Sequence, residues 1–187
     1  FVGGQSLRRA LQVKPGVIPA QWWEDEMSGL DEIFREFALT FAGRLEPVDG
    51  DIAFPEELAR NLLDGTHQSL KAVDAYLSSL YRRRDHIDET SWHKTVLWGG
   101  AYVGEVIRWE TNGAMRWVDY NEYMPQHPTL KPLIPERTTA TCAFLVADDG
   151  FMSMPLNKIA RYVDEGEEHS THFFAHCDIS RSKKRAG

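Results

Sequence analysis

Apolar residues recur every three to four positions along residues 22–41, and acidic residues occupy much of the opposite face. This pattern predicts an amphipathic helix that ends near Gly43. Residues 1–20 contain Pro15, Gly16 and Pro19 and predict a weakly structured lead-in. The apolar positions of the expected helix are Trp23, Met27, Leu30, Ile33, Phe34, Phe37, Ala38 and Phe41.

A second helix is predicted after Thr66, which is a good N-cap candidate. Residues 45–65, which precede it, hold two prolines and several acidic residues and predict a loop with one turn of helix at 56–63. Basic residues at 82–84 favour the C-terminal end of the second helix. Its expected buried stripe is Leu70, Val73, Leu77, Leu80 and Tyr81.

Residues 92–109 form an almost entirely apolar stretch that contains three glycines, Gly99, Gly100 and Gly104. A helix that is apolar all round is usually buried on all sides. Each glycine inside a helix costs about 1 kcal/mol relative to alanine, so three of them need a compensating reason. Close approach of a neighbouring helix is the favoured interpretation, and room for a ligand is the alternative.

The hydrophobic period changes after Gly113 from that of helices to that of strands. Residues 115–120 and 139–147 predict strands, and Asp148-Asp149-Gly150 predicts a hairpin turn to a returning strand at 151–154. A helix is expected at 156–164, ending at Gly166. Helices come first and strands later, so we expect an α+β fold: N-terminal helices packed on a small antiparallel sheet, with the glycine-rich helix buried at the centre.

The length of 187 residues suits a single domain, with its core at 66–177 and a disordered basic tail at 180–187. The net charge of −7 speaks against a nucleic-acid-binding face or an anionic membrane as partner. Two cysteines, Cys142 and Cys177, are too few for a disulfide framework, and no stretch approaches a membrane span. A cytoplasmic protein is expected. Because the chain begins with Phe1, an upstream start and a lost targeting segment stay open.

Glu105 is a carboxylate inside the apolar helix 92–109 and needs either a partner or a proton if it is buried. Arg108 lies three residues further on and can reach it, and Arg116 could approach from the next strand. A structural ion pair is the first interpretation. A role in acid–base chemistry is the second.

Three histidines near the C-terminus, His169, His172 and His176, fall in the run HSTHFFAHC. On a helix they would share one face and could hold a divalent metal ion such as zinc. On a strand, His169 would point away from the other two. The pattern does not decide between helix and strand for 169–177, and no cofactor is the first expectation.

Aromatic and acidic residues also gather after the glycine-rich helix, where they could form a binding surface or serve as ordinary strand residues. Together with the helix pair they are the candidate binding residues Glu105, Arg108, Trp117, Asp119, Tyr120 and Tyr123. The sequence shows neither a GxSxG nucleophile motif nor a phosphate-binding GxxxxGK[ST] or GxGxxG motif.

The runs SLKAVDAYLSSL, GGAYVGEVIRW, RWVDY and FMSMPLNKIARYVDEGEEHS resemble a family of small bacterial domains of unknown function. The resemblance covers about residues 66–174, with the matching positions concentrated at 100–105 and 155–158. Similar small acidic domains occur as immunity or accessory proteins beside toxins, so the resemblance implies such a role.

We therefore expect a protein-binding module, such as an immunity or accessory protein, that acts by occluding a partner. The alternatives are a metal-dependent enzyme that uses His169, His172 and His176, and a small-molecule sensor with a pocket between the aromatic helix and the sheet. Because no catalytic constellation is evident, an enzyme is the less favoured class.

Overall fold

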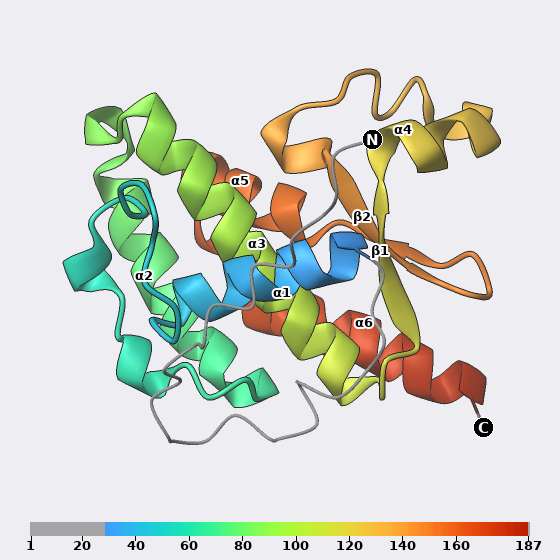
Figure 1. Ribbon diagram of the computed structural model, residues 1–187, viewed down its shortest axis with the longest axis horizontal. Helices are drawn as coiled ribbons and strands as arrows, with labels where there is room; N and C mark the ends of the chain where they lie inside the picture. Colours follow the sequence, from blue (N-terminus) through green and yellow to red (C-terminus); the bar gives the residue numbers. More distant parts are fainter. Residues whose placement is uncertain (1–28, 187) are drawn as a thin grey trace, which may run out of the picture.

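The computed structural model describes residues 29–186 and has an α+β fold (Figure 1). A short helix, α4 (Tyr120–Tyr123), follows the first strand directly. The strands are β1 (Met115–Asp119), β2 (Ala143–Ala147) and β3 (Met152–Ser153). The longer helices are α1 (Gly29–Phe41), α2 (Leu70–Arg82), α3 (Glu89–Glu110), α5 (Pro155–Glu165) and α6 (Thr171–Ala186).

The three strands form one antiparallel sheet in the order β1-β2-β3. Met115 pairs with Ala147 and Asp119 with Ala143, while Leu145 pairs with Ser153 across the hairpin. The predicted turn at 148–150 is confirmed, because Gly150 has a φ of +82° and its N–H donates to the carbonyl of Ala147. The second strand is shorter than expected, since 139–141 form a turn of 3-10 helix.

Side chains alternate between the two faces of the sheet, and each face is buried against a different partner. Met115, Trp117 and Leu145 join the main core with the helices. Residues of the other face belong to a second, smaller core that α4 and the segment 124–142 complete. That second core contains Val118, Tyr120, Tyr123, Met124, Ile134, Phe144 and Val146.

Helix α3 lies at the centre of the molecule (Figure 1). Every residue from 98 to 107 is buried. A Cβ on Gly100 would lie 2.7 Å from the Cα of Leu156 in α5, and a Cβ on Gly104 would lie 2.2 Å from the indole of Trp117. The glycines therefore admit close neighbours, and the interpretation as packing positions is confirmed. At Gly104 that neighbour is a strand side chain rather than a helix backbone.

Helix α1 and the loop after it are part of the main core, which therefore reaches beyond the expected range of 66–177. The ring of Phe34 stacks on Trp117 with centroids 4.0 Å apart, and Phe41 is fully buried. Leu63 is also fully buried. The predicted helix at 22–41 is confirmed over 29–41. Its earlier apolar residues, Trp23 and Met27, and the lead-in 1–20 lie outside the described residues.

The predicted stripe of α2 is buried apart from Tyr81, which is half-buried and packs against Gly166. The capping prediction for Thr66 is wrong: its side chain binds Asp64, and a turn of 3-10 helix at 67–69 separates it from α2. The sequence also missed Tyr76, which is buried and donates a hydrogen bond from its hydroxyl to the carbonyl of Ala53.

Helix α6 settles the ambiguity at 169–177, because it begins at Thr171 and leaves His169 in the preceding 3-10 turn. It continues to Ala186, so the prediction of a disordered tail from 180 is wrong up to that residue. Helix α5 ends as predicted at Gly166, which has a φ of +103°. Over the part of the chain described, none of the helices combines the length and apolar character needed to cross a bilayer.

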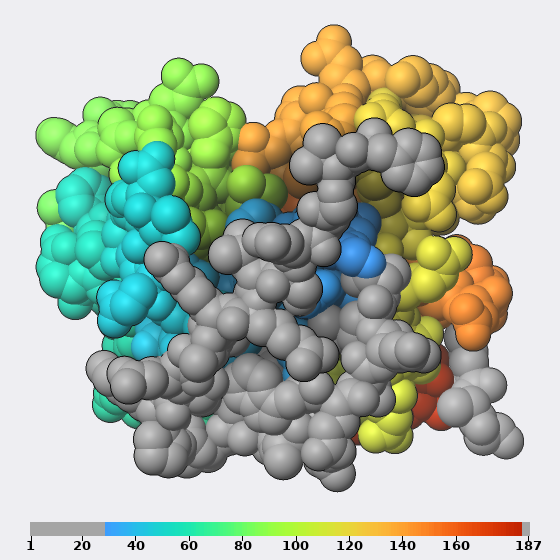
Figure 2. Space-filling model, viewed as in Figure 1, coloured from blue at the N-terminus to red at the C-terminus, as the bar shows by residue number. Residues whose placement is uncertain are grey.

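The segment 124–142 projects from the sheet as a lobe, coloured yellow to orange in Figure 2. The same view shows a notch between this lobe and the green part of the chain around the start of α3. The side chains of Thr139 and His93 bridge the two parts, with Oγ1 and Nδ1 2.6 Å apart. The lobe is thereby fixed to α3 as well as to the sheet.

Candidate functional site

Glu105 belongs to a buried network of charged and aromatic side chains. Its Oε1 accepts hydrogen bonds from Nη1 of Arg108 and from the indole Nε1 of Trp117, each at 2.9 Å. Arg108 also donates to the carbonyl of Met115 and lies 3.7 Å from the carboxylate of Asp31. Asp31 in turn accepts the backbone N–H of Trp117 at 2.8 Å. The network joins α1, α3 and β1.

This pairing supports the structural interpretation of Glu105. A buried carboxylate whose oxygen is held by a guanidinium and an indole is compensated rather than exposed to a substrate. The expected approach of Arg116 does not occur: Arg116 points to solvent and lies 3.8 Å from Glu122. In place of Arg116, the indole N–H of Trp117 donates the second hydrogen bond to Glu105.

The expected aromatic binding surface is not on the surface. Trp117, Tyr120 and Tyr123 are 2%, 5% and 6% exposed, and each is packed in one of the two cores. Asp119 caps α4 by accepting the N–H of Asn121 and forms an ion pair with Arg137 at 3.1 Å. These four residues therefore pack or form caps and ion pairs at the end of β1, and a role of theirs in binding stays a prediction.

The three C-terminal histidines, His169, His172 and His176, do not lie together. His172 and His176 lie one turn apart on α6, and both approach His67, a residue that precedes α2. The rings of His67 and His172 are stacked with centroids 4.1 Å apart, and those of His67 and His176 are 5.8 Å apart. His67 was not predicted, because it stands 105 positions from His172 and carries no local motif.

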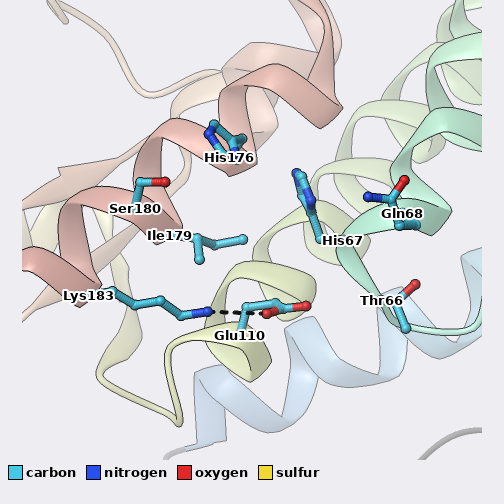
Figure 3. A pocket seen from close by; sticks show the side chains of 8 residues that line it. All are labelled: Thr66, His67, Gln68, Glu110, His176, Ile179, Ser180 and Lys183. Carbon is cyan, nitrogen blue, oxygen red and sulfur yellow. Dashed lines mark ion pairs between the residues drawn. The ribbon is translucent and has the colours of Figure 1, made fainter.

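A cavity of about 330 Å³ opens beside these histidines, between α6, the 3-10 turn before α2 and the end of α3. Figure 3 shows His67 and His176 on opposite sides of it, with the ion pair of Glu110 and Lys183 across one wall at 3.5 Å. The sequence placed a sensor pocket between the aromatic helix and the sheet. The cavity here lies at a different edge of α3. Its lining residues are Thr66, His67, Gln68, Glu110, His176, Ile179, Ser180 and Lys183.

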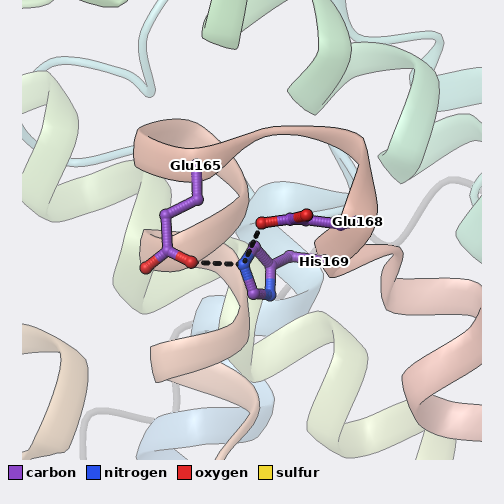
Figure 4. A group of neighbouring side chains, drawn as sticks. All are labelled: Glu165, Glu168 and His169. Carbon is purple, nitrogen blue, oxygen red and sulfur yellow. Dashed lines mark hydrogen bonds and ion pairs between the residues drawn. The ribbon is translucent and has the colours of Figure 1, made fainter.

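His169 lies in a separate cluster with Glu165 and Glu168 (Figure 4). Its Nε2 is hydrogen-bonded to Glu165 and lies 3.6 Å from Glu168. One possible ligand atom from each of these residues lies within 4.8 Å of the others, which is close enough for them to share a metal ion. His169 is buried, whereas Glu168 is largely exposed.

The surroundings of this cluster favour an ion-pair network over a metal site. Arg161 already holds both oxygens of Glu165, at 3.0 and 2.7 Å, and together with His169 it lowers the pKa of Glu165 to about 2. The Nδ1 of His169 faces the ammonium of Lys158 at 3.4 Å. A metal-bound histidine usually donates its second N–H to an acceptor, and an ammonium is a donor.

A second buried acid lies on the inner side of α6. Asp178 is 9% exposed and accepts a hydrogen bond from the hydroxyl of Ser153 in β3. Burial raises the pKa of Asp178 above its usual value, against the lowering effect of Ser153 and of the cations Arg181 and Lys158. The bond fastens α6 to the sheet.

The lobe 124–142 is rich in proline and carries an exposed apolar side chain. It contains four of the nine prolines of the chain, at positions 125, 128, 132 and 135. The hydroxyl of Tyr120 donates to the carbonyl of the buried Ile134 at 3.0 Å, and Lys131 donates to that hydroxyl. Next to Ile134, the side chain of Leu133 is 78% exposed.

No family model, curated protein or solved structure matches the chain. The resemblance to small bacterial domains therefore stays a prediction that depends on the sequence motifs. The function is argued below from the residues and their geometry.

Proposed function

We propose that the protein is a protein-binding module that covers a surface of a partner protein, with the lobe 124–142 as its contact. The observation that carries the proposal is Leu133, an apolar side chain that is 78% exposed on a well-anchored loop. Loops of this length without long secondary structure are commonly functional.

The construction of the lobe favours binding because the backbone is ordered before a partner arrives. Prolines on both sides of Leu133, at 132 and 135, restrict φ, and the bonds of Tyr120 to Ile134 and of Asp119 to Arg137 hold the loop to the sheet. A contact residue on such a loop loses little conformational entropy when it is buried by a partner.

The pairing of Glu105 adds support, because the most conspicuous buried carboxylate of the helix 92–109 is engaged in packing rather than presented to a substrate. The motif resemblance to immunity and accessory domains points in the same direction. Occlusion of a partner's surface is the mode of action that the resemblance implies.

The test is photo-crosslinking in cells that make the protein, with a benzoylphenylalanine at position 133. A partner should be crosslinked from 133 and not from position 62, where Leu62 is also exposed, at 56%, but lies in the loop before α2. The partner should then be purified and its affinity for the variants measured.

We expect Leu133→Ala to weaken binding of that partner by about 5- to 30-fold, which corresponds to roughly 1–2 kcal/mol for an interface anchor. Leu133→Asp should weaken it further, and the matched control Leu62→Asp should bind like the wild type. Crosslinking with equal yield from both positions, or equal affinity of Leu133→Asp and wild type, would refute the assignment.

A further inference from the structure

The first turn of α6 is held to the start of α2 by two histidines from distant parts of the chain. The Nε2 of His67 lies 2.9 Å from the carbonyl oxygen of His172 and donates to it, since a carbonyl can only accept. The two rings are stacked, with centroids 4.1 Å apart and planes inclined by 21°. We propose that His67 and His172 form a pH-sensitive contact, which holds α6 on α2 at neutral pH and releases the helix in mild acid.

The buried nitrogen of His172 makes the contact sensitive to protonation. Its Nε2 is buried and has no hydrogen-bond partner among residues 29–186. In the neutral ring this nitrogen can keep its lone pair, with the hydrogen on Nδ1. A protonated ring would instead place a charged N–H there without an acceptor, and an unpaired buried charge costs far more than an unpaired neutral group. The stacked arrangement therefore requires a neutral His172.

The charged and titratable groups around His172 also oppose its protonation. His67 stacks on the ring, Lys71 of α2 carries an ammonium, and His176 lies on the next turn of α6. Asp74 of α2 acts in the opposite direction, but its carboxylate already accepts the first N–H groups of α6. Burial, followed by the effects of His67 and Lys71, lowers the pKa of His172 below its usual value.

The direction of the pH effect follows from this lowered pKa. Release of α6 returns the ring of His172 to water, where an imidazole has a pKa of about 6.5. The docked helix therefore binds this proton less tightly than the released helix does. Docking is at full strength above about pH 6.5 and weakens as the pH falls from there towards the lower pKa of the docked state.

Asp178, the other buried titratable group of α6, has the opposite effect. Burial raises its pKa, so the docked helix holds the proton of Asp178 more tightly than the released helix does. Acid therefore strengthens the attachment of α6 at Asp178 and weakens it at His172. A release of α6 in mild acid cannot be produced by Asp178.

Helix α6 is less firmly attached to the main core than α3 is. Its buried apolar side chains there are Ala175 and Ile179, with Phe174 packed in part, whereas α3 is buried throughout 98–107. Elements with few buried apolar contacts open at a lower free energy than the core does. Because α6 supplies one wall of the cavity in Figure 3, its release also opens that cavity.

The test is hydrogen–deuterium exchange of the whole protein at pH 7.5 and pH 5.0, read by mass spectrometry and corrected for the intrinsic exchange rate at each pH. Peptides from α6 should exchange about 5- to 30-fold faster at pH 5.0, where about thirty-fold is the ceiling for one imidazole with a released pKa of about 6.5. Peptides from 98–107 should keep their protection. Equal loss of protection in α3 and α6 would indicate global unfolding and would overturn the proposal.

His172→Phe keeps an aromatic ring that can stack on His67 but takes up no proton. Its α6 peptides should exchange at corrected rates within about two-fold of each other at the two pH values. His172→Gln also lacks the titrating group and serves the same purpose if the phenylalanine variant does not fold. The matched control His86→Gln, on an exposed turn, should respond to pH like the wild type. An unchanged rate in wild-type α6, or a full pH response in either variant of His172, would overturn the proposal.

Discussion

Replacing Gly100 by alanine is the sharpest test of why the central helix contains glycine. The new Cβ would lie 2.7 Å from the Cα of Leu156 and 3.0 Å from its backbone nitrogen. These are backbone atoms of α5, so the clash cannot be relieved by a side-chain rotation, and the two helices must move apart.

The expected loss follows from two opposing contributions. Overpacking of a core costs about 1–3 kcal/mol, and a contact with backbone belongs at the upper end of that range. Alanine recovers about 1 kcal/mol of helix propensity relative to glycine. We therefore expect Gly100→Ala to lower the free energy of unfolding by about 2 kcal/mol, and to lower the Tm by roughly 4–8 °C in a chain of this size.

Gly99→Ala is the matched control, because it is the same substitution at the neighbouring position of the same helix. Its Cβ would lie 3.3 Å from Cε2 of Phe41 and 3.5 Å from Cδ1 of Ile159, both of which are side-chain atoms that can adjust. The gain in helix propensity then equals or exceeds the cost of the new contacts. The free energy of unfolding should therefore stay equal or rise by up to about 1 kcal/mol.

The assay is equilibrium unfolding in urea, followed by far-UV circular dichroism, for the wild type and both variants. A common m-value would show that the variants differ in stability and not in the extent of unfolding. The packing argument is refuted if Gly100→Ala stays within about 0.5 kcal/mol of the wild type, or if Gly99→Ala loses as much stability as Gly100→Ala.

Two further substitutions concern the buried acids. Glu105→Gln keeps an acceptor for the indole of Trp117 but removes the charge facing Arg108. It should lower the free energy of unfolding by about 1–3 kcal/mol in the same assay. Unchanged stability would contradict the structural role. Asp178→Asn keeps an acceptor for the hydroxyl of Ser153 and removes a carboxylate whose pKa is raised by burial. The folded state holds that proton more tightly than the unfolded state does. The wild type therefore loses stability as the pH rises through the folded pKa of Asp178, where the buried carboxylate becomes charged. The variant should therefore be more stable than the wild type at pH 7 and lose this advantage near pH 4, and a constant difference across this range would contradict the reasoning.

Much of the fold could be predicted because local patterns determine local structure. The apolar period of 92–109 together with its glycines indicated a buried, closely packed helix, and α3 with its contacts at Gly100 and Gly104 confirms this. The turn at 148–150 and the helix end at Gly166 followed from the conformations that glycine permits. The pair of Glu105 and Arg108 followed from their i, i+3 spacing.

Contacts between residues far apart in the sequence could not be predicted in the same way. Tyr120 and Tyr123 are as suitable for a surface as for a core, and only the lobe 124–142 folding back over the sheet decides that they are buried. The sequence grouped His169 with His172 because they are neighbours in the chain. The structure groups His172 with His67, because the docking of α6 beside the start of α2 is a long-range event.

The hydrogen bond between the carboxylate of Asp31 and the backbone N–H of Trp117 bears on how the chain folds during synthesis. The two residues are 86 positions apart. At a ribosomal rate of 5–20 residues per second, α1 leaves the ribosome roughly 4–17 s before its partner strand. Throughout that interval the apolar face around Phe34 has no sheet to pack on and stays open to other apolar surfaces.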